Sequence, residues 1–503
     1  MLLAWCLVRF RVEHGVARAM TNPESTDVPG NPLTDSDTRR RFWDSTAIKM
    51  DTWNGWGGAY HRRLLRVYRH LIAPGQRVLE VGCGRGDLLA GLEPVHGVGV
   101  DFSGEMVERA RDRHPELTFI EADAHALELE GDFDAIILSD LVNDVIDVQA
   151  VLEHVAAVSK PSTRIILNLH SQAWRPILSL ARWMGLAKPL LPQNWLTRED
   201  VGHLLFLSGL EVIRSWQEVL YPLPLPLLAG FANRFLARIW PFRHASLSNF
   251  ILARPAPVRR ELPAEPIVSV IVAARNEAGN VASILERVPE MGGGTELVFV
   301  EGGSTDDTYA VIEQQIAENP EKPWKLFKQP GKGKGDAVRV GFEEASGEIL
   351  MILDADLTVP PEDLPRFYEA LRSGKADFVN GVRLVYPMEK RAMRFFNLLG
   401  NKFFSMAFSW LLEQPIKDTL CGTKVLWKSD YERIAANRSY FGDFDPFGDF
   451  DLIFGAVKQN FRIVDLPIRY RERTYGDTNI QRWRHGVLLL RMVLFAARRI
   501  KFV

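Results

Sequence analysis

The chain has 503 residues, of which 47% are hydrophobic and 25% are charged, and its formal net charge is −2. This length exceeds one ordinary hydrophobic core, so two or three domains are expected. The balanced charge excludes recruitment of nucleic acid by the field of the whole protein. The three widely spaced cysteines fit neither a disulfide framework nor a zinc cluster, which favours a reducing, cytoplasmic setting.

The N-terminal residues are predicted to lie outside any folded domain. Residues 1–8 are apolar, but no basic residue precedes them and no cleavage site follows, so we interpret them as an upstream extension, with Met20 as an alternative start. Residues 20–40 are rich in Thr, Asn, Pro, Asp and Gly, and a disordered leader over residues 1–40 is expected. No stretch reaches the roughly 18–20 uncharged apolar residues that span a bilayer.

A first domain is predicted over residues 41–253. A helix is expected over 59–71, followed by strands at 77–81, 96–101, 117–121, 135–138 and 164–169 with helical segments between them. Such alternation predicts a parallel, Rossmann-like sheet with helices on both faces. The Pro- and Leu-rich residues 221–242 depart from the pattern and are interpreted as an insertion with a hydrophobic surface. Residues 248–253 are expected to return to the sheet as a last strand.

A second α/β domain is predicted over residues 267–480. The proline-rich residues 254–266 form the linker before it, since proline density favours an extended spacer. Strands are expected at 267–273, 296–300, 325–328, 348–353 and 378–382, and a basic amphipathic segment follows over 481–503. The linker predicts two separately folded catalysts.

The first domain carries a glycine-rich loop after its first strand. The loop Gly82-Cys-Gly-Arg-Gly86 allows a ligand to approach the strand end. Asp101 ends the second strand, where it can bind the two hydroxyls of a ribose. Asp123 is placed to meet an adenine edge, and Asp140 ends the fourth strand under the ligand. A nicotinamide dinucleotide would use Asp101 in the same way, so that alternative stays open, as does a tight turn that binds nothing.

With Glu80 ahead of the G-x-G-x-G loop, residues 40–220 resemble class I S-adenosylmethionine-dependent methyltransferases. The resemblance implies S-adenosylmethionine as cofactor, held by Glu80, Gly82, Gly84, Asp101, Phe102, Asp123 and Asp140. Aligning an acceptor with the methyl group carries much of the rate in such enzymes. If the acceptor needs a base, His170 and Asn168 are the candidates.

The second domain carries motifs suited to a nucleoside diphosphate. Its first strand ends near Asn276 and Glu277, and its second ends at Glu301, an acid for a base or ribose edge. Lys334 lies in a glycine-rich loop that leaves room for phosphates. Asp354-Ala-Asp356 ends a strand, with both carboxylates expected on one face. Such oxygen ligands suit Mg²⁺ or Mn²⁺, although an acidic pair at a strand end is by itself common.

In order and spacing, residues 266–480 resemble family 2 glycosyltransferases of the GT-A fold, in the branch of polyprenyl- or dolichyl-phosphate hexose synthases. The motifs are Asp354–Leu364, Asp418–Lys424 and Arg471–Asn479. The resemblance implies inversion at the anomeric carbon. The implied catalytic residues are Asp354, Asp356, Asp451 and Arg473, with Asp356 as metal ligand. The implied substrate contacts are Ala274, Asn276, Glu277, Glu301, Lys334, Arg383, Asp418 and Arg471.

One departure concerns the nucleotide. The family usually has two adjacent acids after the second strand, whereas this chain has Glu301-Gly302, which leaves UDP and GDP both open.

The basic, apolar segments 391–412 and 482–503 suit either a core helix or a headgroup-plane helix. The family resemblance favours the second, and so a peripheral protein at the inner face of the membrane.

A bifunctional enzyme is therefore expected, with a nucleotide-sugar donor, a lipid-phosphate or glycan acceptor, and no nucleic-acid partner. Two alternatives are a glycosyltransferase with a catalytically silent S-adenosylmethionine-binding domain, and a membrane-recruited scaffold that binds nucleotides without turnover.

Overall fold

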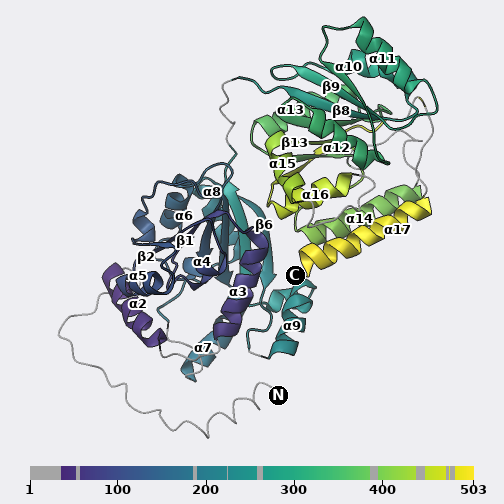
Figure 1. Ribbon diagram of the computed structural model, residues 1–503. Coiled ribbons are helices and arrows are strands. Elements are labelled where there is room, and N and C mark those ends of the chain that lie inside the picture. Colours follow the sequence, from purple (N-terminus) through teal and green to yellow (C-terminus); the bar gives the residue numbers. More distant parts are fainter. Residues whose placement is uncertain are drawn as a thin grey trace, which may run out of the picture.

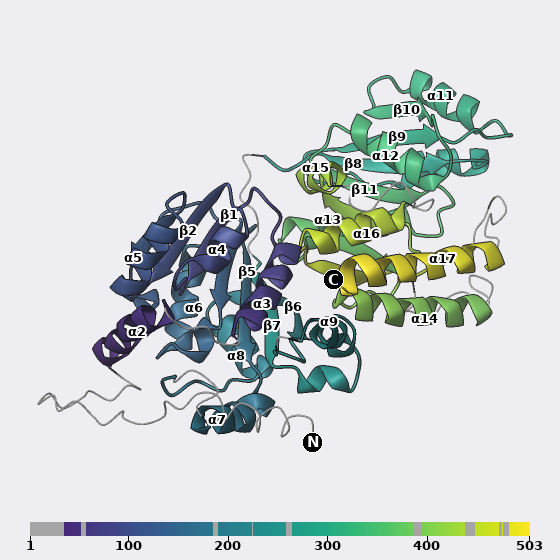
Figure 2. The ribbon, with the colours of Figure 1, turned by 60° about the horizontal axis from the view of Figure 1, so that its bottom comes forward.

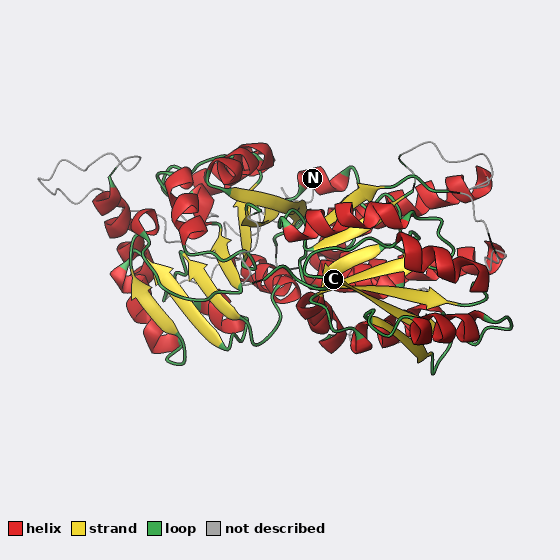
Figure 3. Ribbon diagram, turned by 90° about the horizontal axis from the view of Figure 1, so that it is seen from above, coloured by secondary structure: helices red, strands yellow, loops and turns green. Residues whose placement is uncertain are grey.

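The structure is a computed structural model that describes residues 35–51, 57–184, 190–223, 225–257, 264–383, 385, 395–437, 448–471, 475 and 482–502. Two α/β domains lie next to each other, each built on its own seven-stranded sheet (Figure 1). Figure 3 shows each sheet enclosed by helices. The predicted fold class, two α/β domains, is confirmed.

The N-terminal sheet has the strand order β3-β2-β1-β4-β5-β7-β6. Its strands are β1 (Arg77–Val81), β2 (His96–Asp101), β3 (Thr118–Glu121), β4 (Ala135–Ser139), β5 (Arg164–His170), β6 (Leu210–Glu218) and β7 (Ser248–Pro255). The predicted return strand is confirmed as β7, but it runs antiparallel to β5 and β6, so the expectation of a wholly parallel sheet is wrong at this edge. Strand β6 was not predicted.

Two apolar layers enclose this sheet. The helices that bear on one face are α3 (Gly57–Leu71), α4 (Asp87–Gly91) and α5 (Gly104–Arg113), and on the other α6 (Val148–Ala157) and α8 (Arg198–Leu207). Strand β1 supplies both layers, since Val78 packs toward α3 and Leu79 toward α6, as strand alternation requires. Helices α7 (Arg175–Trp183) and α9 (Pro226–Arg234) lie outside the sheet (Figure 2).

The predicted leader lies mostly outside the described residues. Its last five residues, 36–40, belong to helix α2 (Ser36–Met50), which Asp35 caps by accepting hydrogen bonds from the backbone N–H groups of Asp37 and Thr38. An N-cap aspartate of this kind stabilises a helix start by about 1 kcal/mol.

The C-terminal sheet has the order β10-β9-β8-β11-β13-β12-β14. Its strands are β8 (Val268–Ala274), β9 (Thr295–Glu301), β10 (Trp324–Lys328), β11 (Ile349–Asp354), β12 (Phe378–Val382), β13 (Lys424–Trp427) and β14 (Ile463–Pro467). Strand β13 is antiparallel to both of its neighbours. The five predicted strands are present within a residue or two of their expected bounds, and β13 and β14 were not predicted.

Helices pack on both faces of this sheet as well. One layer contains α10 (Val281–Arg287), α11 (Thr308–Glu318) and α13 (Leu364–Arg372). The other contains α12 (Lys334–Glu344), α14 (Phe395–Leu412), α15 (Lys428–Ala436), α16 (Asp449–Lys458) and α17 (Arg482–Ala496). Helices α14 and α17 lie side by side at the outside of this layer (Figures 1 and 2).

Buried polar contacts join the two domains. Asp377, ahead of β12, accepts hydrogen bonds from Arg164 Nη2 at 2.8 Å and Arg254 Nη1 at 3.0 Å. Asn460 donates from Nδ2 to the carbonyl of Leu71 at 2.8 Å and accepts at Oδ1 from Arg214. Each domain has its own core, and the linker is not their sole connection. The predicted linker also overlaps β7, which continues to Pro255.

Candidate active sites in the two domains

The carboxyl ends of three neighbouring strands assemble the site of the C-terminal domain. Strand β8 lies between β9 and β11, and the register pairs Ala274 with Glu301 and Ala273 with Asp354. Parallel strands end at the same edge of a sheet, where ligands bind in open α/β folds. Three of the predicted site residues therefore lie at one edge.

Lys334 and Asp354 form the centre of this site. Lys334 Nζ, at the first residue of α12, donates to Asp354 Oδ1 at 2.5 Å. Burial opposes ionisation of both groups, yet their attraction lowers the pKa of Asp354 and raises that of Lys334. Gly422 passes over the pair so closely that a Cβ there would lie 2.2 Å from Asp354 Oδ2 and 2.2 Å from Lys334 Nζ. A side chain at position 422 would therefore displace the Lys334–Asp354 pair.

Asp356 lies in a turn, not in the strand. Strand β11 ends at Asp354, and the N–H of Leu357 donates to the Asp354 carbonyl at 3.2 Å. The strand alternation from which a shared face was predicted therefore does not extend to Asp356. Asp356 Oδ1 accepts hydrogen bonds from the Thr358 N–H at 3.1 Å and the Thr358 hydroxyl at 2.7 Å. Both carboxylates still act electrostatically on Tyr470.

Arg383 and Asp418 form a buried pair beside the site. Arg383 donates to Asp418 in a bidentate manner, from Nε at 2.7 Å and from Nη2 at 2.9 Å. Although burial raises it, the pKa of Asp418 is held below its usual value by Arg383. The guanidinium also lies over the ring of Tyr470 and helps to lower the pKa of Asp354. The pair therefore fixes one cation at this edge of the sheet.

Two charged residues of the site were not among the predicted ones. Lys424, the first residue of β13, is fully buried, and its Nζ lies 3.7 Å from Asp449 Oδ1 at the start of α16. Burial raises the pKa of Asp449, although Lys424 and Lys334 lower it. A Cβ on Gly448 would lie 2.5 Å from Gly335 Cα, so the starts of α12 and α16 are in close contact. The Asp418–Lys424 motif contained this signal, because a lysine there is unusual for a buried strand.

Hydrogen bonds connect the loop after β8 with the loop after β9. Asn276 adopts a left-handed backbone with φ of 57°, and its Oδ1 accepts from the N–H of Thr305 at 2.8 Å. Glu277 is buried and accepts from Asn280 Nδ2 at 2.7 Å. The buried Glu301 carboxylate accepts from the N–H of Ser304. Ala274, Asn276, Glu277 and Glu301 therefore belong to one connected region.

The other predicted residues of this domain lie on different elements. Asp451 is buried in the first turn of α16, 3.6 Å from Arg339 Nη2. Arg471 is exposed, and its N–H donates to the Thr358 carbonyl in the loop after β11. Arg473 lies outside the described residues. No group of three or more His, Cys, Asp or Glu side chains with metal-site geometry occurs within the described ranges.

The predicted cofactor loop of the N-terminal domain is tightly turned. Gly82, Gly84 and Gly86 have φ of 75°, 53° and 76°, which favour glycine. Asp101 at the end of β2 accepts from the N–H of Gly84 at 2.8 Å and of Ser103 at 3.0 Å. Burial raises the pKa of Asp101 to about 6. Phe102 follows at the same strand end and is half-buried.

Glu80 lies in the middle of this site and is 2% exposed. Burial raises its pKa to about 8, although a hydrogen bond from the Leu89 backbone lowers it. Its Oε2 has no hydrogen-bond partner among the described residues. A neutral carboxyl group is therefore expected at neutral pH.

Asp140 is the centre of a polar cluster at the end of β4. Its backbone is left-handed, with φ of 56°, and its carboxylate accepts from Tyr60 OH at 2.9 Å and from Asn168 Nδ2 at 2.5 Å. Tyr60 OH is also 3.0 Å from Ser248 Oγ on β7. His170 Nε2 lies 3.7 Å from Asp140 Oδ1. The two base candidates thus both contact Asp140, whereas Tyr60 and Ser248 were not predicted.

Asp123, the remaining predicted cofactor contact, begins the short turn after β3. Its Oδ1 accepts from the N–H of His125 at 2.9 Å and lies 2.7 Å from His125 Nδ1.

Comparisons with known proteins match each domain to a family. Residues 57–215 match the family described as methyltransferase domain, and residues 269–432 match glycosyl transferase family 2. Magnesium protoporphyrin IX methyltransferase from Synechocystis, a crystal structure with bound SAH, aligns with 44% of this chain and all of that one, at 18% identity and a TM-score of 0.33.

Two curated relatives match the C-terminal domain. A dolichol-phosphate mannosyltransferase from Pyrococcus furiosus is 29% identical over 42% of this chain and 59% of its own length. A polyprenol monophosphomannose synthase from Mycolicibacterium smegmatis is 27% identical over 41% of this chain and 78% of its own length. The chain thus spans little more than half of the Pyrococcus relative. The two family matches, together with the two sheets, identify residues 57–215 as a methyltransferase domain and residues 269–432 as a family 2 glycosyltransferase domain.

Proposed function

We propose that the C-terminal domain transfers a hexose from a nucleoside diphosphate sugar to a polyprenyl phosphate. The observation that carries this proposal is the Lys334–Asp354 pair beneath Gly422 at the carboxyl edge of the sheet. A fixed lysine and the buried Arg383 supply two cations where a diphosphate would develop charge as it leaves. The names of the two relatives, a dolichol-phosphate and a polyprenol enzyme, support a lipid-phosphate acceptor.

A divalent metal fits the residues at this edge. Asp356 offers a carboxylate, and Mg²⁺ or Mn²⁺ is commonly held by one or two carboxylates together with substrate phosphates. Asp354 is already paired with Lys334, so Asp356 would be the main protein ligand. When bound, the metal would offset charge on the diphosphate. The hydrogen bonds from Thr358 hold the Asp356 carboxylate in one orientation.

Asp451 is proposed to orient the acceptor. A phosphate acceptor is already ionised at neutral pH, so no strong general base is required. The position of Asp451 supports this role, because its carboxylate is buried at the start of α16 and lies 3.6 Å from Arg339 Nη2, which holds it in place. Arg471 and Arg473 remain proposed contacts to phosphate groups.

Peripheral contact with the inner face of a membrane is part of this proposal. Among the described residues, no helix is long and apolar enough to cross a bilayer. Helix α14 exposes Phe403, Met406 and Trp410, and α17 exposes Val487, Leu490 and Leu494. In each helix these residues follow an i, i+3, i+7 spacing, which places them on one face of that helix as an apolar stripe. Exposed Arg491 and Arg498 add positive charge for anionic headgroups.

The glycosyl-transfer proposal is tested with purified protein, UDP- and GDP-sugars and a short polyprenyl phosphate, with and without Mn²⁺. We expect a hexosylated lipid by mass spectrometry, and an Asp356→Ala protein that stays folded but loses transfer. Product formation at the wild-type rate by Asp356→Ala would contradict the role of the carboxylate. If no donor yields product, the scaffold alternative replaces the enzyme.

For the N-terminal domain we propose S-adenosylmethionine-dependent methyl transfer. The carrying observation is the left-handed glycine loop whose Gly84 N–H is bound by the Asp101 carboxylate, since this places an acid for ribose hydroxyls beside a loop open to a ligand. Asp140, which contacts Tyr60, Asn168 and His170, supports a polar acceptor side.

Calorimetry with S-adenosylhomocysteine tests this second proposal. We expect one site per chain, lost on Asp101→Ala. If the folded wild-type protein does not bind S-adenosylhomocysteine, both the bifunctional enzyme and the glycosyltransferase with a silent S-adenosylmethionine-binding domain are ruled out. Binding without methylation of any glycosylation product would favour the silent domain.

A further inference from the structure

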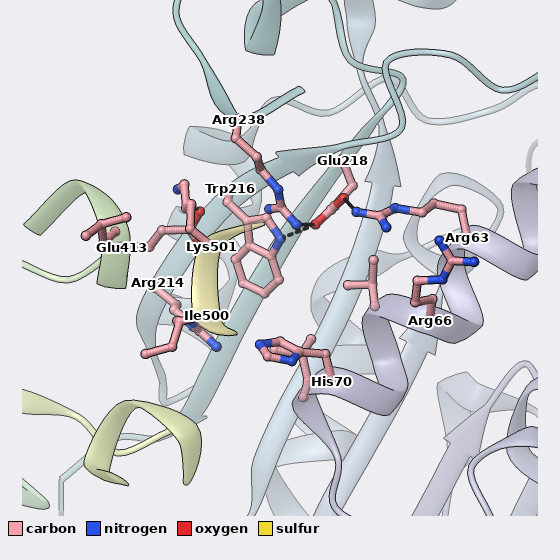
Figure 4. Close-up of a pocket in the computed structure, with 13 residues that line it drawn as sticks. Arg63, Arg66, His70, Arg214, Trp216, Glu218, Arg238, Glu413, Ile500 and Lys501 are labelled. Carbon is pink, nitrogen blue, oxygen red and sulfur yellow. Dashed lines mark hydrogen bonds and ion pairs between the residues drawn. The ribbon is translucent and has the colours of Figure 1, made fainter. Parts of the chain in front are cut away.

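A positively charged cavity lies between the two domains. Its inner chamber, of about 30 Å³, is lined by side chains of α3 and β6, by Arg238, and by side chains of the C-terminal domain that include Glu413 and Lys501. Figure 4 shows the α3 arginines on one side of Trp216 and Glu413 with Lys501 on the other. The chamber is therefore built by both domains.

Positive charge exceeds negative charge in the chamber by three. Five arginine or lysine side chains line it against two glutamates, Glu218 and Glu413. Glu218 is fully buried and is shared by two arginines, with Arg63 Nη2 at 3.0 Å from one oxygen and Arg238 against the other. Glu413 forms an ion pair with Lys501, whose Nζ lies 2.5 Å from Glu413 Oε1. The carboxylates present cannot neutralise all the cations.

The buried guanidinium groups are incompletely satisfied. Arg214 and Arg238 are each 9% exposed, and the buried Nε atom of each has no hydrogen-bond partner within the part of the chain that the structure describes. Burial lowers the pKa of Arg214 and Arg238 lowers it further, whereas Glu413 raises it. His70 has a pKa well below its usual value through burial and nearby cations, so it adds no charge at neutral pH. Arg238 is paired with Glu218, whereas Arg214 donates to Asn460 and has no carboxylate partner within the described residues. A buried cation without an anionic partner is costly, and a bound anion would offset that cost.

A second chamber of about 300 Å³ adjoins the first. The two share Trp216, Arg238, Glu413 and Lys501 as lining residues. The second chamber adds Arg198 and Arg243 together with the apolar surfaces of Trp410 and Pro415. An anionic group at the shared wall would have room for an attached organic group in the larger chamber.

We propose that this interdomain cavity binds a phosphate monoester, with the phosphate at the shared wall and its ester group in the larger chamber. Guanidinium groups match phosphate oxygens in geometry, and a dianion suits the excess of positive charge. Because Arg214 and Arg238 belong to one domain and Lys501 to the other, bound phosphate would also strengthen the docking of the domains. The proposal does not depend on either proposed enzymatic activity.

Titration calorimetry and thermal unfolding of the full-length chain test the site. The probes are inorganic phosphate, methyl phosphate and farnesyl phosphate. Because phosphate can also meet the glycosyltransferase site, each titration is repeated in a Lys334→Ala background. We expect methyl phosphate to bind the Lys334→Ala protein at one site per chain and to raise its unfolding temperature.

Three variants locate the binding. Arg214→Gln should weaken methyl phosphate binding by about tenfold or more, as loss of a charge-assisted contact predicts. The double variant Arg66→Ala/Arg243→Ala removes two cations that are not engaged in the buried Glu218 and Glu413 pairs, and it should fold and also bind more weakly. Arg62→Ala makes the same type of charge change on α3 outside the lining and should bind as wild type.

Equal affinity of the folded double variant, Arg62→Ala and wild type would overturn the proposal. So would binding that disappears with Lys334→Ala alone, or no binding of any probe at millimolar concentration. The probes also distinguish the source of the ligand. Farnesyl phosphate that binds about tenfold or more tightly than methyl phosphate indicates a lipid, and equal affinities indicate a soluble phosphate ester.

Discussion

Replacement of Glu80 by glutamine should stabilise the ligand-free protein at alkaline pH. The folded protein releases the Glu80 proton only near pH 8, because burial raises its pKa from the reference value of 4.5 to about 8. The unfolded chain releases it near pH 4.5. A carboxyl group whose pKa is higher in the folded protein contributes stability that is fully present below its pKa in the unfolded chain. That stability is lost as the pH rises from the unfolded pKa to the folded pKa.

The magnitude follows from that interval. At about 1.4 kcal/mol for each pH unit, the loss between pH 4.5 and about 8 is on the order of 5 kcal/mol. This is comparable with the whole stability of many domains, about 5–15 kcal/mol. Glutamine resembles the protonated acid, so it keeps the acceptor for the Leu89 N–H and removes the titration.

Denaturant unfolding of wild type and Glu80→Gln from pH 5 to pH 9, at intervals of about one unit, measures the effect. The variant should unfold at a higher denaturant concentration than wild type, and the gap should widen with pH and level off above pH 8. Glu130→Gln on the exposed surface is the matched control and should show no such widening. A gap that stays constant over this range would refute the argument that Glu80 is neutral in the folded state.

Three further changes have defined outcomes. Gly422→Ala should reduce glycosyl transfer by about a hundredfold or more, as misplacement of a catalytic group does, because the added Cβ would collide with Asp354 and Lys334. Binding of S-adenosylhomocysteine to the same protein should be unchanged. Full transfer activity of the variant would contradict the close packing of Gly422 on this pair. The affinity for S-adenosylhomocysteine should fall by roughly tenfold per pH unit below about 6 as Asp101 protonates, and a calorimetric profile equally flat for wild type and Asp101→Asn would contradict this. Asp377→Ala removes the carboxylate paired with buried Arg164 and one of the two carboxylates paired with buried Arg254, and it should cost about 3–5 kcal/mol in equilibrium unfolding. A loss under about 1 kcal/mol would mean that the interdomain contact is weak.

Local hydrophobic pattern predicted most strands, including β3 and β10 at the sheet edges, but not β6, β13 and β14. Strands β1, β2 and β12 have the expected bounds because short apolar runs between turn residues are a strong local signal. Strand β13 has only four residues and begins with the fully buried Lys424, so its first residue does not resemble a strand interior. Its place between β11 and β12 depends on contacts distant in sequence.

The same division applies to the sites. Asp101, Glu301 and Asp354 could be predicted because each ends a central strand, and the strand order brings such ends together. Tyr60 could not, because it reaches Asp140 from a helix 80 residues earlier. Asp449 depends on the close contact between α12 and α16, which only the folded chain creates.

The docking through Asp377 and Asn460 has a consequence for the order of events on a shared substrate. Domains held by buried contacts do not swing past each other to hand over an intermediate. A molecule modified at both sites must leave the first and diffuse to the second. If that molecule is lipid-linked, it diffuses between the two sites in the plane of the membrane. The lag before doubly modified product appears would then depend on the membrane area per enzyme, and not on the length of the proline-rich linker.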